Sequence, residues 1–195
     1  MKRTALEKRK TRETDITVKV NLDGKGASKI STGIGFLDHM LELFSKHSLM
    51  DMEITAKGDI HVDYHHTVED IGIVLGTAIR RALGEKSEIT RFCSARVPMD
   101  EALVEASLDI SGRPYLDYKI KTRQVKLGTF NVSLVKEFMK AFVMNSGVTL
   151  HLSLIHGEDL HHIYEAVFKS LAKVFREAVK IDKRVKGAPS TKGSL

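Results

Sequence analysis

The chain has 195 residues, 42% of them hydrophobic, and a formal net charge of +6. This apolar content is enough for a core in one domain, or in two small halves packed together. No apolar stretch approaches the roughly 18 residues that span a membrane, and the basic N-terminus has no apolar segment typical of a secretory signal. The single cysteine, Cys93, excludes an internal disulfide and suits a reducing compartment. We therefore expect a cytoplasmic protein without a membrane partner.

The net positive charge has two interpretations. Basic and acidic residues intermix along the chain, which is typical of a solvated surface. A net charge of +6 also favours an anionic partner. Composition alone does not distinguish a nucleic acid from a small phosphate ester as that partner.

The first half of the chain predicts two strands, a helix, a third strand and a second helix. Residues 14–20 alternate apolar and polar side chains, and the glycine-containing turn at 23–26 predicts a hairpin. Apolar residues at helical spacing predict the helices, with Gly84 as the second C-cap. In chain order, the predicted elements are 14–20, 27–32, 36–47, 50–59 and 66–83.

The second half predicts the same order of elements. They lie at 102–110, 115–121, 134–144, 148–155 and 162–180. Each half is thus roughly β-β-α-β-α, which indicates an α+β two-layer sandwich made by internal duplication. The half-repeats would be 1–89 and 90–195, packed as one catalytic unit. The Gly/Ser/Lys-rich tail from Val185 to Leu195 has no periodicity, so we expect it to be disordered or to close over something.

One pattern rich in possible metal ligands occurs twice. DYHHTVED at 63–70 and DLHHIYEA at 159–166 match at an offset of 96 residues in their Asp, both His and Glu. The helix before each motif also repeats, which aligns Glu137 with His39. Each half therefore carries four potential ligands, which are His39, His65, His66 and Glu69, then Glu137, His161, His162 and Glu165. Two sets in register, with their flanking helices, favour metal binding over capping or surface roles.

The spacing within each motif indicates more than one ion. The first His and the Glu are four residues apart, so both lie on one helical face. The second His points about 100° away, and we expect it to serve a different ion. The sequence therefore predicts two ions, each with ligands from more than one element. Imidazole mixed with carboxylate suits a divalent ion such as Mn, Fe, Zn or Ni.

Several other polar residues have alternative interpretations. His47 has no counterpart in the repeat and is either a helix-end residue or a catalytic group. Asp38 and Asp70 lie beside ligands, where they either orient imidazoles or are simply solvated. By spacing alone, three basic residues are typical surface charges, namely Arg91, Arg113 and Lys169.

Six segments together resemble imidazoleglycerol-phosphate dehydratase, the dehydratase of histidine biosynthesis. In the family's order, they are GFLDHML, HHTVEDIG, RFCSARVPMDEAL, DISGRPYL, HH-x-x-E-A-x-F-K and PSTKG. The resemblance covers essentially the whole chain. It implies two Mn²⁺ ions per active site, held by the eight ligands above, and a homo-oligomer of 24 subunits with sites built between subunits. Many members have His where this chain has Glu137, and a carboxylate ligand there is chemically reasonable.

The resemblance also implies roles for residues outside the repeat. Glu13 would contact the reacting part of the substrate, and His47 and Asp100 are further candidates for proton transfer. The substrate phosphate would lie against six residues, which are Arg91, Arg113, Lys169, Ser190, Thr191 and Lys192.

The implied reaction is that of a lyase, which converts imidazole-glycerol phosphate to imidazole-acetol phosphate and water. The metals would serve as Lewis acids and as a template, while cationic side chains fix the phosphate. A dinuclear metallohydrolase acting on small phosphate esters is the alternative, because it needs the same parts. A basic RNA-binding module is disfavoured, since aromatic residues make up 6% of the chain and mostly take core positions. We therefore expect no nucleic-acid partner.

Overall fold

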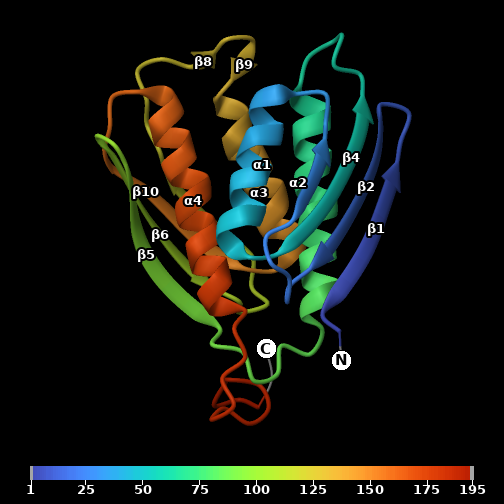
Figure 1. Ribbon diagram of the computed structural model, residues 1–195, viewed down its shortest axis with the longest axis vertical. Helices are drawn as coiled ribbons and strands as arrows, with labels where there is room; N and C mark the ends of the chain where they lie inside the picture. The colour runs from blue at the N-terminus through green and yellow to red at the C-terminus, as the bar shows by residue number, and fades with distance from the viewer. Residues whose placement is uncertain (1, 194–195) are drawn as a thin grey trace.

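Two four-stranded sheets enclose four helices in the computed structural model, which describes residues 2–193 (Figure 1). The first sheet has the order β1-β2-β4-β3 and the second β5-β6-β10-β7. In each, the first three strands are antiparallel and the last pairs in parallel with its neighbour. The strands are β1 (Thr4–Lys10), β2 (Thr14–Asn21), β3 (Ser28–Ser31), β4 (Asp51–Gly58), β5 (Phe92–Met99), β6 (Ala102–Asp109), β7 (Tyr115–Lys119) and β10 (Thr149–His156). The shared topology confirms the predicted duplicated α+β fold.

The four helices form the middle of the molecule, and each half alone is a two-layer unit of sheet and helices (Figure 1). They are α1 (Gly35–Ser48), α2 (His65–Leu83), α3 (Ser133–Ser146) and α4 (Leu160–Ala178). A short hairpin, β8 (Lys126–Leu127) and β9 (Phe130–Asn131), precedes α3. Helix α1 packs on α4, and α2 packs on α3, so the main helix contacts join the two halves. All four helices begin at the upper end of Figure 1, which places their first turns together.

One apolar core lies between these helices. Phe44 of α1 is fully buried and stacks edge-on against Phe142 of α3 and Phe175 of α4, with ring centroids 6.2 and 5.7 Å apart. Phe138 of α3 contacts Phe168 of α4 at 5.8 Å. Burial of such rings stabilises the fold by about 1.5–3 kcal/mol each. The two halves therefore share their largest buried side chains.

Two glycines let α2 and α3 approach closely. A Cβ added at Gly72 would lie 2.7 Å from the carbonyl oxygen of Phe138, and one at Gly76 would lie 2.5 Å from that of Phe142. Both distances are too short for real Cβ atoms. The Gly-x-x-x-Gly spacing keeps both glycines on one helical face, as in other close helix pairs. The separation of α2 and α3 thus depends on these two positions.

Each four-stranded sheet has one strand more than the sequence pattern predicted, and the short β8–β9 hairpin was not predicted either. Strand β1 was not predicted because its side chains do not alternate, and Glu7 is its only buried one. Glu7 forms an ion pair with Arg81, with Oε1 and Nη1 2.5 Å apart. The side chain of β1 that points toward the core is therefore a carboxylate and not an apolar group. Strand β5 likewise has no fully buried side chain. Both are edge strands, where charged residues are common.

The predicted hairpin between residues 14–20 and 27–32 is wrong. Strand β2 pairs with β1 and β4, whereas β3 pairs in parallel with β4 at the other edge. The carboxylate of Asp51, the first residue of β4, accepts hydrogen bonds from the backbone N–H groups of Lys25 and Ala27 at 2.8 and 3.0 Å. These bonds hold the loop before β3 against the start of β4. Helix α1 then provides the crossover that a parallel pair requires.

The tail folds against the body of the protein over its described residues. The N–H of Glu88 donates to the carbonyl of Gly187 at 2.8 Å, and Arg91 Nη1 donates to the carbonyl of Pro189 at 2.8 Å. This agrees with the expectation that the tail closes over something, although Ser194 and Leu195 lie outside the described residues. Within residues 2–193, no helix combines the length and the apolar character required to cross a membrane.

Candidate metal and substrate site

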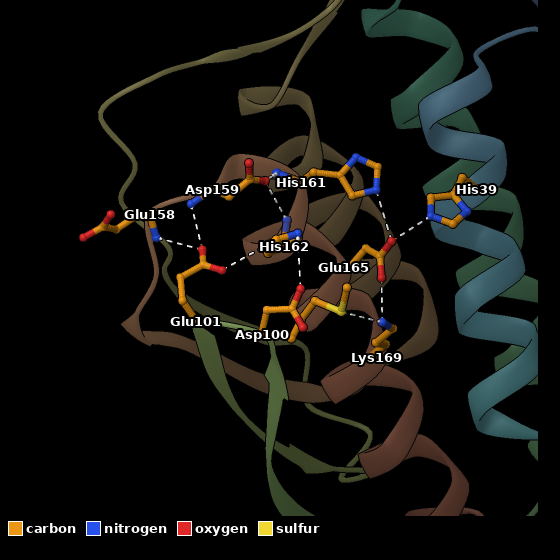
Figure 2. Close-up of polar contacts among 10 residues, drawn as sticks. His39, Asp100, Glu101, Glu158, Asp159, His161, His162, Glu165 and Lys169 are labelled. Carbon is orange, nitrogen blue, oxygen red and sulfur yellow. Dashed lines mark hydrogen bonds and ion pairs between the residues drawn. The ribbon is translucent and has the colours of Figure 1, made fainter.

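Three predicted ligands from both halves converge where α1 meets α4 (Figure 2). The Nε2 atom of His39 lies 3.0 Å from Glu165 Oε1, and that of His161 lies 3.1 Å from the same oxygen. Glu165 is buried, while the two imidazoles are half-buried. The cluster therefore takes one ligand from the first half and two from the second.

The spacing of these atoms fits a divalent ion. Imidazole nitrogens and carboxylate oxygens bind such ions at about 2.0–2.2 Å. Two ligands at right angles around the ion then lie about 3 Å apart, by geometry from those bond lengths. The observed separations from Glu165 Oε1 are 3.0 and 3.1 Å. These residues can hold a borderline metal ion without large rearrangement.

Lys169 lies one turn beyond this cluster. Its Nζ donates to Glu165 Oε2 at 2.5 Å and lies 3.0 Å from the sulfur of Met99. Burial raises the pKa of Glu165, but the hydrogen bonds from Lys169 and from His39 outweigh it and lower the pKa to about 2. The carboxylate is thus ionised, as a metal ligand must be.

The related set in α2 and α3 is more open. His65 Nε2 lies 3.7 Å from Glu69 Oε2, and both side chains are nearly half-exposed. Glu137 lies on α3, which packs against α2. In the internal repeat Glu137 corresponds to His39, and α3 packs on α2 as α1 packs on α4. Among the described residues, however, Glu137, His65 and Glu69 do not converge as closely as His39, His161 and Glu165 do.

The second histidine of each pair points away from the first, as the helical spacing predicted. His65 and His66 have ring centroids 6.1 Å apart and planes at 88°. The Nδ1 atom of His66 lies 2.9 Å from Asp59 Oδ2 and 3.8 Å from Glu13 Oε2. The hydrogen bond to Asp59 raises the pKa of His66.

His162 has an equivalent carboxylate neighbour (Figure 2). Its Nδ1 lies 2.7 Å from Glu101 Oε2, and its Nε2 lies 3.7 Å from Asp100 Oδ2. Glu101 also accepts the backbone N–H of Asp159, and this bond, with the one from His162, lowers the pKa of Glu101 to about 2. Asp159 in turn caps α4 by accepting the N–H groups of both His161 and His162.

Sequence reasoning missed Asp59 and Glu101 as neighbours of the histidines. The signal for Glu101 was present, but it lay in aligning the first predicted strand of each half, at an offset different from that of the histidine repeat. Strand β2 begins at residue 14 and β6 at residue 102, an offset of 88 residues, and the same offset aligns Glu13 with Glu101 in the preceding turns. Asp59 directly follows β4 and carries no distinctive pattern.

Most of the residues expected to contact phosphate gather at the other end of the molecule. They line one hollow, together with Pro189, and are Arg91, Arg113, Ser190, Thr191 and Lys192. Arg91 also forms two hydrogen bonds to Asp109, at 2.8 and 3.2 Å. The N–H of Arg91 donates to the carbonyl of Ala178 at the end of α4. At 1.5 Å per residue, that carbonyl is about 20 Å along α4 from Glu165. Of the predicted phosphate contacts, Lys169 alone therefore lies near the candidate metal ligands.

Three residues with open interpretations have defined positions. Asp38 accepts hydrogen bonds from the N–H and hydroxyl of Thr32, so it fixes the start of α1 rather than an imidazole. Asp70 pairs with Arg9 and accepts from the Thr14 hydroxyl, which ties α2 to the first sheet. His47 is in the last turn of α1, where partial burial and the charge of Lys169 lower its pKa.

The fold and this site define a duplicated α+β protein in which imidazole and carboxylate groups gather near the helix N-termini. Residues 32–175 match the family model described as imidazoleglycerol-phosphate dehydratase. The chain is 58% identical to an imidazoleglycerol-phosphate dehydratase of Caldanaerobacter subterraneus and 56% identical to one of Thermoanaerobacter pseudethanolicus. Each alignment covers 99% of this chain and 100% of the relative.

Solved structures agree with the sequence relatives. Imidazoleglycerol-phosphate dehydratase from Staphylococcus aureus superposes with a TM-score of 0.84 at 37% identity, covering 92% of this chain and 99% of that one. The enzyme from Pyrococcus furiosus also gives 0.84, at 41% identity, covering 97% of this chain and 100% of that one. The chain belongs to the imidazoleglycerol-phosphate dehydratase family.

Proposed function

We infer that the protein is a hydro-lyase of histidine biosynthesis, which converts imidazole-glycerol phosphate to imidazole-acetol phosphate and water. The observation that carries this function is the full-length match to imidazoleglycerol-phosphate dehydratases at 54–58% identity. The comparisons give no support to the alternative of a dinuclear metallohydrolase. A biosynthetic role and a single half-buried cysteine also support a cytoplasmic location.

We propose that the eight predicted ligands hold two Mn²⁺ ions per active site. The support is the close approach of His39, His161 and Glu165, together with the sequence repeat that aligns Glu137, His65 and Glu69 with them. Bound metal would supply Lewis acidity and fix the imidazole ring of the substrate. The chain's own contribution is to hold these ligands on helix ends that the shared core keeps in place.

We propose further that each active site draws on more than one subunit. The phosphate-binding candidates at Arg91 and the tail are about 20 Å along α4 from Glu165. A small phosphorylated imidazole cannot reach both ends of one chain. A neighbouring subunit would bring its tail end to the helix N-termini of the first, and we propose a homo-oligomer of 24 subunits. In that arrangement Arg91 and Arg113 offer planar guanidinium groups suited to phosphate, with Ser190, Thr191 and Lys192 beside them.

We propose three candidates for proton transfer, two of which lie in strand turns near the second histidines. Glu13 lies in the β1–β2 turn with its side chain 56% exposed, and Asp100 lies in the equivalent β5–β6 turn. Both can reach a substrate bound over the helix ends. His47 is the third candidate, because its lowered pKa leaves the imidazole neutral and able to accept a proton. We favour Glu13 as the residue that contacts the reacting carbons.

One experiment tests both the reaction and the metal. Purified protein would be analysed for bound transition metals and incubated with imidazole-glycerol phosphate, with the ketone product and free phosphate measured in parallel. We expect about two divalent ions per chain and formation of the ketone without phosphate release. Release of free phosphate would instead indicate the metallohydrolase, and protein that forms the ketone without any bound metal would contradict the metal assignment.

A further inference from the structure

The second histidine of each pair has a carboxylate at the same ring nitrogen. Glu101 Oε2 lies 2.7 Å from Nδ1 of His162. In the other half, Asp59 Oδ2 lies 2.9 Å from Nδ1 of His66. The two carboxylates come from different places in the fold, one from a strand turn and one from the end of β4. The same contact has therefore been built twice from unrelated residues.

A carboxylate at Nδ1 decides where the proton of a neutral imidazole lies. An ionised carboxylate can only accept, so Nδ1 must carry the hydrogen. The lone pair is then left on Nε2, which is the atom free to bind a metal. In His162, Nε2 faces Asp100 at 3.7 Å, which is too long for a hydrogen bond. The only hydrogen bond that sets this ring's tautomer among the described residues is the one to Glu101.

Glu101 is itself held in one orientation (Figure 2). Its Oε1 accepts the backbone N–H groups of Glu158 and Asp159 at 3.2 and 2.9 Å. These amides lead directly into α4, whose first turn carries His162. One oxygen therefore binds the backbone and the other binds the imidazole, so three hydrogen bonds hold the carboxylate in this orientation.

We propose that Glu101 and Asp59 are positioning residues that fix the tautomer and ring orientation of the second histidines, so that Nε2 is presented to metal. The inference rests on the proposed metal-dependent function. Asp59 and Glu13 also lie close enough to Nδ1 of His66 to form an ion-binding set of their own. We favour the positioning role for Asp59 because Glu101 makes the same contact in the other half. The second oxygen of Glu101 is occupied by backbone amides, which leaves Glu101 only the imidazole to bind.

The decisive variant is Glu101→Gln. Its carbonyl oxygen would keep the two backbone N–H groups, since an amide NH₂ facing them would place donors against donors. The NH₂ group would then face Nδ1 of His162, which must become the acceptor, and the proton would move to Nε2. The variant thus retains the loop anchor but reverses the tautomer. Glu158→Gln is the matched control, because it makes the same chemical change on an exposed side chain that points away from His162 (Figure 2).

Full-length protein would be depleted of metal and titrated with Mn²⁺, and free Mn²⁺ would be followed by electron paramagnetic resonance. We expect Glu101→Gln to lower Mn²⁺ affinity about 10–100-fold, as is usual when a residue that orients a metal-binding histidine is lost, with an unchanged melting temperature. Glu158→Gln should bind as the wild type does. In ¹⁵N-histidine-labelled, metal-free protein at mildly alkaline pH, one imidazole should change tautomer in Glu101→Gln only.

Each outcome has a distinct meaning. Wild-type protein that binds no Mn²⁺ would refute the proposed metal-dependent function itself. Wild-type binding with unaltered affinity or an unaltered ¹⁵N spectrum in Glu101→Gln would overturn the positioning role while leaving that function intact. For the first half, Asp59→Ala should weaken binding without changing the number of ions. Loss of one ion per chain at saturation would show instead that Asp59 is a ligand.

Discussion

The spacing of α2 and α3 depends on Gly76, and replacing it by Val tests this packing. An added Cβ would lie 2.5 Å from the carbonyl oxygen of Phe142 and 3.0 Å from the backbone nitrogen of Ser146. Ordinary contact begins near 3.4 Å, so the helices would have to separate by about 0.9 Å before the two methyl groups of Val are considered. The neighbouring atoms are backbone, which cannot turn aside as a flexible side chain can.

Two opposing effects determine the sign of the change. Val is favoured over Gly in a helix by only a few tenths of a kcal/mol, whereas inserting bulk into a well-packed core typically costs about 1–3 kcal/mol. The clash therefore wins, and we expect a net loss of about 1–3 kcal/mol. For a chain of this length, each kcal/mol lowers the melting temperature by about 2–4 °C. Gly76→Val should thus melt about 2–12 °C below the wild type.

Thermal melting followed by circular dichroism provides the measurement, and Gly35→Val is the matched control. Gly35 is the first residue of α1, and a Cβ there would meet nothing within 4 Å. We expect the control to stay within about 0.5 kcal/mol of the wild type, as exposed substitutions usually do. If Gly76→Val melted at or above the temperature of Gly35→Val, the close approach of α2 and α3 at Gly76 would be refuted.

Three further predictions concern the proposed site. Glu165→Gln keeps the side-chain shape but removes the ligand charge, so Mn²⁺ affinity should fall, whereas Lys169→Ala should mainly raise the KM for the phosphorylated substrate. Equal loss of metal binding in these two variants would contradict the separate roles. Glu13→Gln should keep both ions and lose about 10²–10⁴-fold in turnover; a near wild-type rate with full metal occupancy would move the proton transfer to His47 or Asp100. Chelation should abolish turnover and loosen the assembly, because converging ligands would be left without an ion. Size-exclusion chromatography would detect the loosened assembly, and activity that survives complete metal depletion would argue against this prediction.

Local patterns in the sequence predicted much of the fold. Alternation revealed β2, β4, β6 and β10, and helical spacing revealed all four helices to within a few residues. These elements have one buried face, and that face leaves a periodic trace. The edge strand β1 has one buried side chain, and the inner face of β5 is only half-buried, so neither was predicted. The 96-residue repeat also gave the eight candidate ligands, because duplication preserves the residues and their spacing together.

Only the tertiary structure decided which elements meet. Strand β3 pairs in parallel with β4 rather than with the strand before it, because Asp51 holds the intervening loop away from a hairpin. His39 joins His161 and Glu165 of the other half, since α1 packs on α4 and not on α2. An internal repeat aligns equivalent residues, but it does not say which copy packs on which. Tertiary packing also produces the contact between Glu101 and His162, and it separates the phosphate candidates from the candidate metal ligands. These two features depend on the length of α4 and on the strand turns beside its first residues, which long-range packing brings together.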